Sequence, residues 1–233
     1  MTAPAFRNVV ESHGSGSTSL VVTTPTYVNG DLLVVAFGFP YPGETLSTLA
    51  GWTYQGTASG GTTGGGSAGY MQVYTKIANG DGVSSTWAAS GTGAWHALMA
   101  SYSNVDQTTP FDVAATNVTQ GASASSTAPA SGVTTSHNNE TVLTFTRYLN
   151  NSAFTPCASP SMNSRIATYD ASVGIGTTIA LADYTVSSAG ATGSLNASIG
   201  TSAKNHSCTI AINPVLITPQ FWTDFIKCAE VDS

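Results

Sequence analysis

The longest apolar run of the chain extends from Asp31 to Phe39 and reads Asp-Leu-Leu-Val-Val-Ala-Phe-Gly-Phe. Turn-forming residues stand on both sides of it, Asn29-Gly30 before the run and Pro40 to Gly43 after it. With the two-residue period of a strand, both faces of the run are apolar, which is typical of a strand covered on both sides. A short buried helix is the alternative interpretation.

Alternating apolar and polar residues predict further strands in the first half of the chain. The clearest is Tyr70 to Ile77, which places Met71 and Val73 on one face. The segment Asn79 to Gly82 after it is interpreted as a hairpin turn, because the later acidic ligands of a calcium loop are missing. The other predicted strands cover residues 17–24, 52–57, 84–89 and 95–102.

The pattern of the first half recurs in the second half. The run that starts at Asp31 is echoed by the run that starts at Glu140, 109 positions later, and Val-Thr-Thr and an Asn precede both. A Tyr-Thr pair at Tyr74 returns 110 positions later at Tyr184. A third block, residues 96–102, is echoed in the same order by 207–213. These echoes predict two copies of one unit of six strands.

We therefore expect an all-β protein, a jelly-roll-like antiparallel β-sandwich built from two pseudo-repeats. The predicted boundaries are an N-terminal arm at 1–16, a sandwich at 17–217 and a short C-terminal helix at 218–233. Within the sandwich, the pseudo-repeats are placed at 17–113 and 127–217. Two separate small sandwiches are the alternative, but the second copy is poor in aromatic residues, which favours a core shared with the first.

The C-terminal tail departs from the strand pattern. A Thr-Pro pair at Thr218 is typical of a helix start. The residues at four-residue spacing after it would form one apolar flank. Such a helix would pack on its own sandwich or dock into a neighbouring subunit. The predicted partner-binding anchors are Phe221, Trp222, Phe225 and Ile226.

Composition excludes two classes of partner. Apolar residues make up 41% of the chain, enough for a core, whereas charged residues are 8% against a usual share of about 25%. A net charge of −6 with six Lys and Arg argues against nucleic acid as a partner, since phosphate binding needs clustered cations. The chain has no apolar run of membrane-spanning length, and residues 1–7 lack the features of a signal peptide.

Catalytic, cofactor-binding and metal-binding residues are not expected. None of the four histidines, His13, His96, His137 and His206, is taken to have a carboxylate or cysteine at ligand spacing. His96 is interpreted as a half-buried structural residue. The carboxylates are scattered among predicted loops, so an enzyme is not expected. Free, buried thiols are expected at Cys157, Cys208 and Cys228, with a Cys157–Cys208 bridge as the alternative.

One group of aromatic residues admits two interpretations. Trp52 and Tyr54, with Tyr70 and Tyr74, would line a sugar-stacking face if they were exposed. Packing in the core between sheets is the alternative.

Five motifs resemble a β-sandwich module of tailed-phage structural proteins, which also has similar forms in some bacterial surface proteins. They are a "GDLL" strand at Gly30, an "AGW" turn ending at Trp52, a "Y-x-K-x-A" strand at Tyr74, a strand ending at Tyr102 and a "P-x-D" turn ending at Asp112. The strand ending at Tyr102 is similar to the family's "A-x-L-x-x-Y" pattern, with Met99 at the Leu position. The resemblance spans about residues 17–214. It implies a non-enzymatic virion part with a degenerate second copy. The second copy has no "AGW" where Cys157 to Pro160 stands.

The resemblance does not specify whether such a part sits on the head, the tail or a fibre. The function that we expect is a capsid decoration or cement protein on the outer surface of the virion. Its partner would be the major capsid protein or another virion protein, and it would form a homotrimer or homodimer. The alternative is a carbohydrate- or receptor-binding module of a head or tail fibre, in which Trp52 and Tyr54 would stack on sugar rings.

Overall fold

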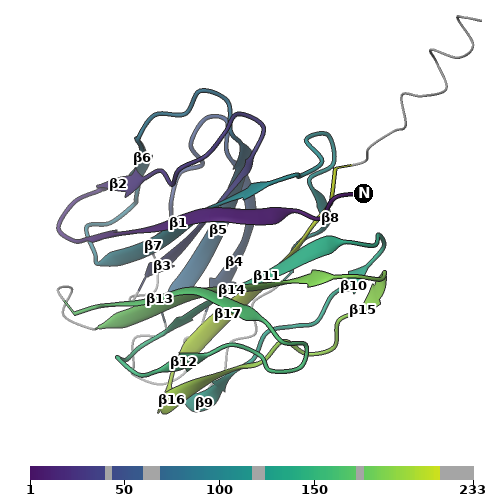
Figure 1. The fold of residues 1–233 in the computed structure, drawn as a ribbon. Helices are drawn as coiled ribbons and strands as arrows, with labels where there is room; N and C mark the ends of the chain where they lie inside the picture. Colours follow the sequence, from purple (N-terminus) through teal and green to yellow (C-terminus); the bar gives the residue numbers. More distant parts are fainter. Residues whose placement is uncertain (40–43, 60–68, 117–123, 172–175, 216–233) are drawn as a thin grey trace, which may run out of the picture.

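The computed structural model describes residues 1–39, 44–59, 69–116, 124–171 and 176–215, and the regular elements within these ranges are all strands. The predicted tail helix at 218–233 lies outside the described residues. Two five-stranded antiparallel sheets form the body of the molecule (Figure 1). The expected all-β fold, an antiparallel sandwich of two pseudo-repeats, is confirmed.

Each large sheet comes from one half of the chain. The first has the order β1 (Ala5–Gly14), β7 (Trp95–Ser103), β3 (Leu32–Phe39), β5 (Tyr70–Ile77) and β4 (Thr53–Ser59). The second has the order β13 (Asn163–Asp170), β14 (Thr177–Val186), β11 (Glu140–Tyr148), β17 (Asn205–Ile212) and β8 (Phe111–Thr116).

Three smaller sheets accompany the two large ones. The first copy adds the pair β2 (Ser19–Thr23) and β6 (Ser84–Ala88). The second copy adds the pair β10 (Thr134–Thr135) and β15 (Gly190–Ala191), and a three-stranded sheet of β12 (Phe154–Thr155), β16 (Ala197–Ala203) and β9 (Ser125–Ala128).

The strand orders show the duplication directly. Starting from β8, the second sheet runs β8, β17, β11, β14 and β13, which matches β1, β7, β3, β5 and β4 one by one. Residues 1–16 are therefore not an arm. They contain β1, which pairs with β7 from Ala5 to Gly14 and is the counterpart of β8. The first copy thus begins at β1 and the second at β8, earlier in each case than the boundaries predicted from the sequence.

A single apolar layer lies between the two large sheets. It combines residues of both copies: Leu32, Val34, Ala36, Met71, Leu98, Ala100, Leu143, Phe145, Ile179, Leu181, Ile210 and Ile212. The copies pack with β1 against β13, β7 against β14, β5 against β17 and β4 against β8, as a pseudo-two-fold relation requires. Since neither copy buries this face alone, the molecule is one sandwich and not two.

The outer faces of both sheets are also covered. On the first sheet, Leu33, Val35 and Phe37 pack with Leu20 and Trp87 of the β2–β6 pair. All eight residues of β3 are buried, which confirms the prediction of a strand covered on both faces. The segment Asn79 to Gly82 leads from β5 into β6, which belongs to another sheet, so the predicted hairpin turn was wrong.

Polar contacts cross the central layer at both of its ends. At one end, buried His96 of β7 contacts the Thr177 carbonyl oxygen at 3.1 Å through Nδ1 and Glu11 of β1 at 2.8 Å through Nε2. Thr168 of β13 donates to the same Glu11 carboxylate at 2.7 Å. At the other end, the Tyr102 hydroxyl donates to Asp183 of β14 at 2.8 Å. These contacts orient one copy against the other.

Gly38 and Arg147 meet across the central layer. They occupy equivalent positions of β3 and β11, and a Cβ built on Gly38 would lie 3.0 Å from Arg147 Cδ. Arg147 is fully buried, so it has little room to move aside. The missing side chain of Gly38 is thus what admits the arginine.

Replacing Gly38 by Val is expected to destabilise the fold by about 1–3 kcal/mol through overpacking, although valine favours strands. Urea unfolding followed by tryptophan fluorescence measures the loss. Gly200→Val in β16 is the matched control, because Gly200 is exposed and its nearest atom to an added Cβ lies at 3.4 Å. Equal losses in both variants would contradict the packing argument.

Glu11 makes stability depend on pH. The hydrogen bond from His96, with that from Thr168, lowers the pKa of Glu11 from 4.5 to about 2, against an opposing effect of burial. A carboxyl whose pKa is lower in the folded state stabilises the fold above its unfolded pKa and loses that effect as the pH falls toward the folded value. Glu11→Gln should therefore cost on the order of 2 kcal/mol at pH 7, a difference that narrows between about pH 4.5 and pH 2. Thermal unfolding across this range tests it, and a pH-independent difference would refute it.

Candidate functional site

Three ionisable side chains meet at the end of the sandwich where β11 begins. They are Asp112 of β8, His137 of the turn before β11 and Glu140, the first residue of β11. One ligand-type atom from each of them lies within 4.8 Å of the others. Asp112 and His137 are half-buried, and the Glu140 side chain is fully buried.

The local backbone brings these groups together. The His137 N–H donates to Glu140 Oε1 at 2.7 Å, and the Ser136 N–H donates to Asp112 Oδ2 at 2.6 Å. Asn139 holds the turn with a φ of 63°, a conformation that asparagine tolerates better than most residues. Asp112 stands at an irregularity of the β8–β17 ladder, between Phe111 and Val113.

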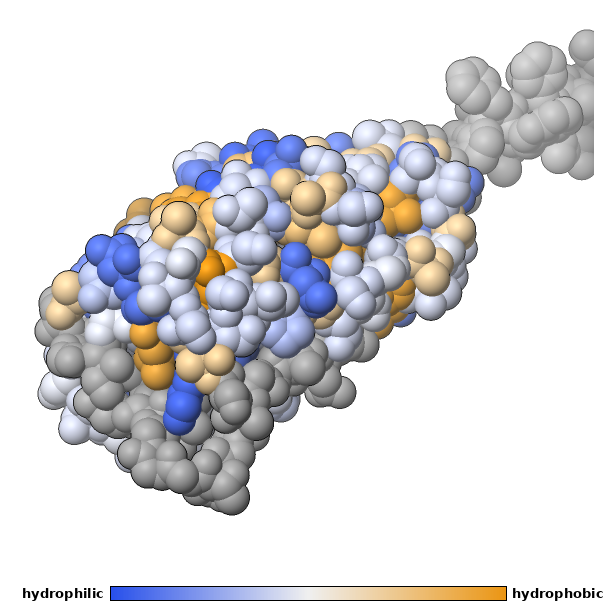
Figure 2. Space-filling model, turned by 90° about the horizontal axis from the view of Figure 1, so that it is seen from below, coloured by the Kyte–Doolittle hydropathy of each residue, from blue (hydrophilic) through white to orange (hydrophobic). Residues whose placement is uncertain are grey.

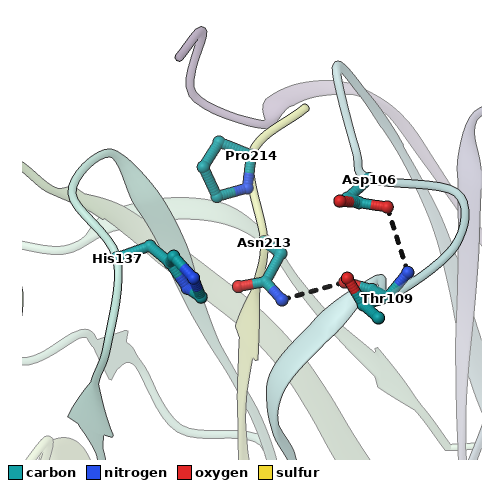
Figure 3. Close-up of a pocket in the computed structure, with 5 residues that line it drawn as sticks. All are labelled: Asp106, Thr109, His137, Asn213 and Pro214. Atoms are coloured by element: carbon teal, nitrogen blue, oxygen red, sulfur yellow. Dashed lines mark hydrogen bonds between the residues drawn. The ribbon is translucent and has the colours of Figure 1, made fainter. Parts of the chain in front are cut away.

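A pocket with about 180 Å³ of empty space lies beside His137 (Figure 3). Its lining comes from three segments: Asp106 and Thr109 before β8, His137 before β11, and Asn213 with Pro214 after β17. Asn213 donates through Nδ2 to the Thr109 carbonyl at 2.8 Å, and its oxygen side is turned toward His137 (Figure 3). That buried Oδ1 has no hydrogen-bond partner among the described residues.

Charge is poorly balanced at this end of the molecule. Burial raises the pKa of Glu140, the His137 N–H opposes this shift, and the negative charge of Asp112 raises the pKa further. Glu140 Oε2 is buried without a hydrogen-bond partner in the described part of the chain. Asp106 differs, because the backbone N–H of Thr109 lowers its pKa. Chemically, Asp112 and Glu140 can hold a proton between them or, with His137, a cation.

The corresponding end of the first copy has a cation where the second copy has Asp112. There, Asp31 is the counterpart of Glu140, and the Arg7 guanidinium donates to both of its carboxylate oxygens, at 2.6 and 3.1 Å. Asp31 Oδ2 also accepts the N–H of Val28 at 2.8 Å, as Glu140 accepts that of His137. A buried carboxylate is thus neutralised in copy one and faces a second carboxylate in copy two.

None of the site residues predicted from the sequence is among the described residues of this site. The tail anchors Phe221, Trp222, Phe225 and Ile226 are outside the described residues. Trp52 is 7% exposed and packs against Trp87, and Tyr70 and Tyr74 are also buried, so they cannot stack on a sugar. Only Tyr54 of the four is exposed, at 45%. The other expectation, core packing, is confirmed for Trp52, Tyr70 and Tyr74.

The remaining sequence expectations have mixed outcomes. Cys157 and Cys208 are free and buried, as predicted, and no bridge joins them; Cys228 lies outside the described residues. His96 is a structural residue but fully rather than half buried. The expectation that no histidine has a carboxylate at ligand spacing was wrong for His137, whose Nδ1 lies 3.3 Å from Glu140 Oε1. The three-residue spacing of His137 and Glu140 was the signal that could have indicated this pair.

Comparisons with known proteins add no identification, since no family model, curated protein or solved structure matches the chain. In the described part of the chain, no helix is both long and apolar enough to cross a membrane.

The opposite charge balance of the two ends predicts opposite effects of carboxylate removal in metal-free buffer. Glu140→Gln should raise the thermal unfolding temperature at pH 7, because the raised pKa shows that ionised Glu140 is unfavourable in the fold. The gain should shrink as the pH falls and Glu140 becomes protonated. Asp31→Asn, the matched control, should lower the unfolding temperature by leaving Arg7 unpaired. Destabilisation by both variants at pH 7 would contradict the predicted repulsion.

Proposed function

We propose that this chain is a non-enzymatic structural protein of a tailed-phage virion, which binds the capsid as a decoration or cement protein. Its partner would be the major capsid protein or another virion protein. The observation that carries the proposal is the duplication of the strand unit whose first copy holds the phage-like motifs, with both copies joined through one central apolar layer. A sandwich of this kind could bind a capsid protein through its edge strands and its outer surface.

The surface supports a protein partner. The face in Figure 2 is mostly pale, with strongly hydrophilic and hydrophobic side chains scattered over it. Charged residues are 8% of the chain. Binding through such a surface would depend on buried area and backbone hydrogen bonds more than on ion pairs.

Each large sheet ends in strands that have a ladder partner on one side only among the described residues. The edge strand β4 runs from Thr53 to Ser59 without a charged residue. Edge strands usually carry charges that prevent pairing with other chains. A neutral edge is suited to strand addition from a neighbouring subunit, which fits an assembling protein.

The alternative, a sugar-binding fibre module, is weakened by the burial of Trp52. Tyr54 alone would remain for stacking, and a single aromatic ring is a poor sugar platform.

Binding to capsids tests the proposal. Full-length chain is mixed with capsids that lack it, from the phage that encodes it, and co-sedimentation is measured beside a chain truncated after residue 217. The full chain should bind in a fixed ratio to the shell, and truncation should weaken binding by at least about tenfold, since a few apolar anchors carry most interface energy. Replacing Phe221, Trp222, Phe225 and Ile226 by serine should have the same effect.

A Tyr54→Ser variant separates the two functions. Capsid binding should be unchanged in this variant. Lack of capsid binding by the full chain, together with host-polysaccharide binding that Tyr54→Ser abolishes, would replace the proposal by the fibre alternative.

A further inference from the structure

We propose that the second copy contains a divalent transition-metal site, for a cation of the Zn²⁺ class, formed by Asp112, His137 and Glu140 with the Asn213 side-chain oxygen beside them. It does not depend on the proposed virion role.

The two copies have the same backbone at this point. Gly30 and Asn139 both have a positive φ, 93° and 63°, and donate their N–H groups at 2.8 Å to Ala78 and Val186 respectively. The two turns therefore have equivalent hydrogen bonds as well as equivalent positions in the sequence repeat. Val28 is thus the counterpart of His137.

The partner strands correspond in the same way. Phe6 pairs with Tyr102 on β7, and Phe111 pairs with Ile212 on β17. In both ladders the register shifts at the next residue, which is Arg7 in the first copy and Asp112 in the second. Asp112 thus occupies the position from which copy one extends a cation toward its buried carboxylate.

Copy two has Asp112 in place of the arginine, so its buried carboxylate Glu140 has no guanidinium from this position to neutralise it. Two carboxylates face each other, and Glu140 is fully buried with Oε2 unpartnered among the described residues. Asn213, 7% exposed, points a second unpartnered acceptor toward His137 (Figure 3). Burying an acceptor without a hydrogen-bond donor costs free energy of folding. A bound cation would interact favourably with both the carboxylate oxygen of Glu140 and the amide oxygen of Asn213.

The donor set indicates which cation. One imidazole and two carboxylates suit zinc and its first-row neighbours, whereas calcium and magnesium prefer oxygen ligands alone. Copy one has Val28 where copy two has His137. Copy two therefore differs from copy one by both an imidazole and a second carboxylate at this end. Where copy one has the Arg7–Asp31 ion pair, copy two has three side chains of the kinds that bind metal ions.

Such a cation would connect three segments at this end of the sandwich. Asp112 lies on β8, Glu140 begins β11 and Asn213 follows β17, directly before the described chain ends at Val215. Metal binding would therefore hold the end of β17 to β8 and to the start of β11, close to the last described residue.

The experiment uses the full chain after dialysis against EDTA, with ZnCl₂ as the probe in isothermal titration and thermal unfolding. We expect one zinc ion bound per chain. The unfolding temperature should rise by about 5–10 °C at a hundredfold excess of zinc over its dissociation constant. CaCl₂ and MgCl₂ at the same concentration should leave the unfolding temperature unchanged.

Two variants replace a proposed ligand in copy two by the residue type at the equivalent position of copy one. Asp112→Arg and His137→Val should each weaken zinc binding by more than about tenfold. Metal-free Asp112→Arg should unfold at the same or a higher temperature than the unchanged chain, because the new guanidinium would pair with Glu140. If Asp112→Arg fails to fold, His137→Val decides, since the His137 side chain is 42% exposed.

Two outcomes would overturn the proposal. One is the absence of a zinc-dependent shift in the unchanged chain, which would leave a proton shared by Asp112 and Glu140 as the account of the site. The other is zinc binding that both variants retain in full. Capsid binding by the EDTA-treated chain is measured separately, so failure of the metal site and failure of the virion role are distinguishable.

Discussion

The central apolar layer between the two large sheets is the constraint on which the rest of the structure depends. Each copy presents a sheet whose two faces are both apolar, and the small strand pairs and loops cover only the outer face. The inner face can be buried only by the other copy. With few charged residues available for ion pairs, burial and sheet hydrogen bonds have to supply most of the stability.

Polar side chains also make hydrogen bonds across that layer, at both of its ends. His96 reaches across to the Thr177 carbonyl, Thr168 reaches across to Glu11, and Tyr102 reaches across to Asp183. Each contact joins a strand of one copy to a strand of the other. Apolar packing is non-directional, so these contacts specify the register in which the two sheets face each other.

Duplication also provides an internal reference for the candidate site. A buried carboxylate at the start of the central strand is retained in both copies, as Asp31 and as Glu140. Its surroundings have diverged, because Arg7 is replaced by Asp112 and Val28 by His137. The backbone did not change with them, as the equivalent hydrogen bonds of the two turns show. New chemistry can arise at such a position without loss of the fold, since the turn is held by main-chain contacts.

The sequence by itself determined the all-β class, the doubly buried strand at Leu32–Phe39 and the existence of two copies. These follow from local periodicity and from repeated blocks, which chain order preserves. Only the tertiary structure decided that β1 belongs to the first copy and that Trp52 is buried. It alone brought Asp112 to Glu140 across 28 positions. The reason is that strand pairing and bulges place residues from distant segments side by side, and a linear pattern does not contain those pairings.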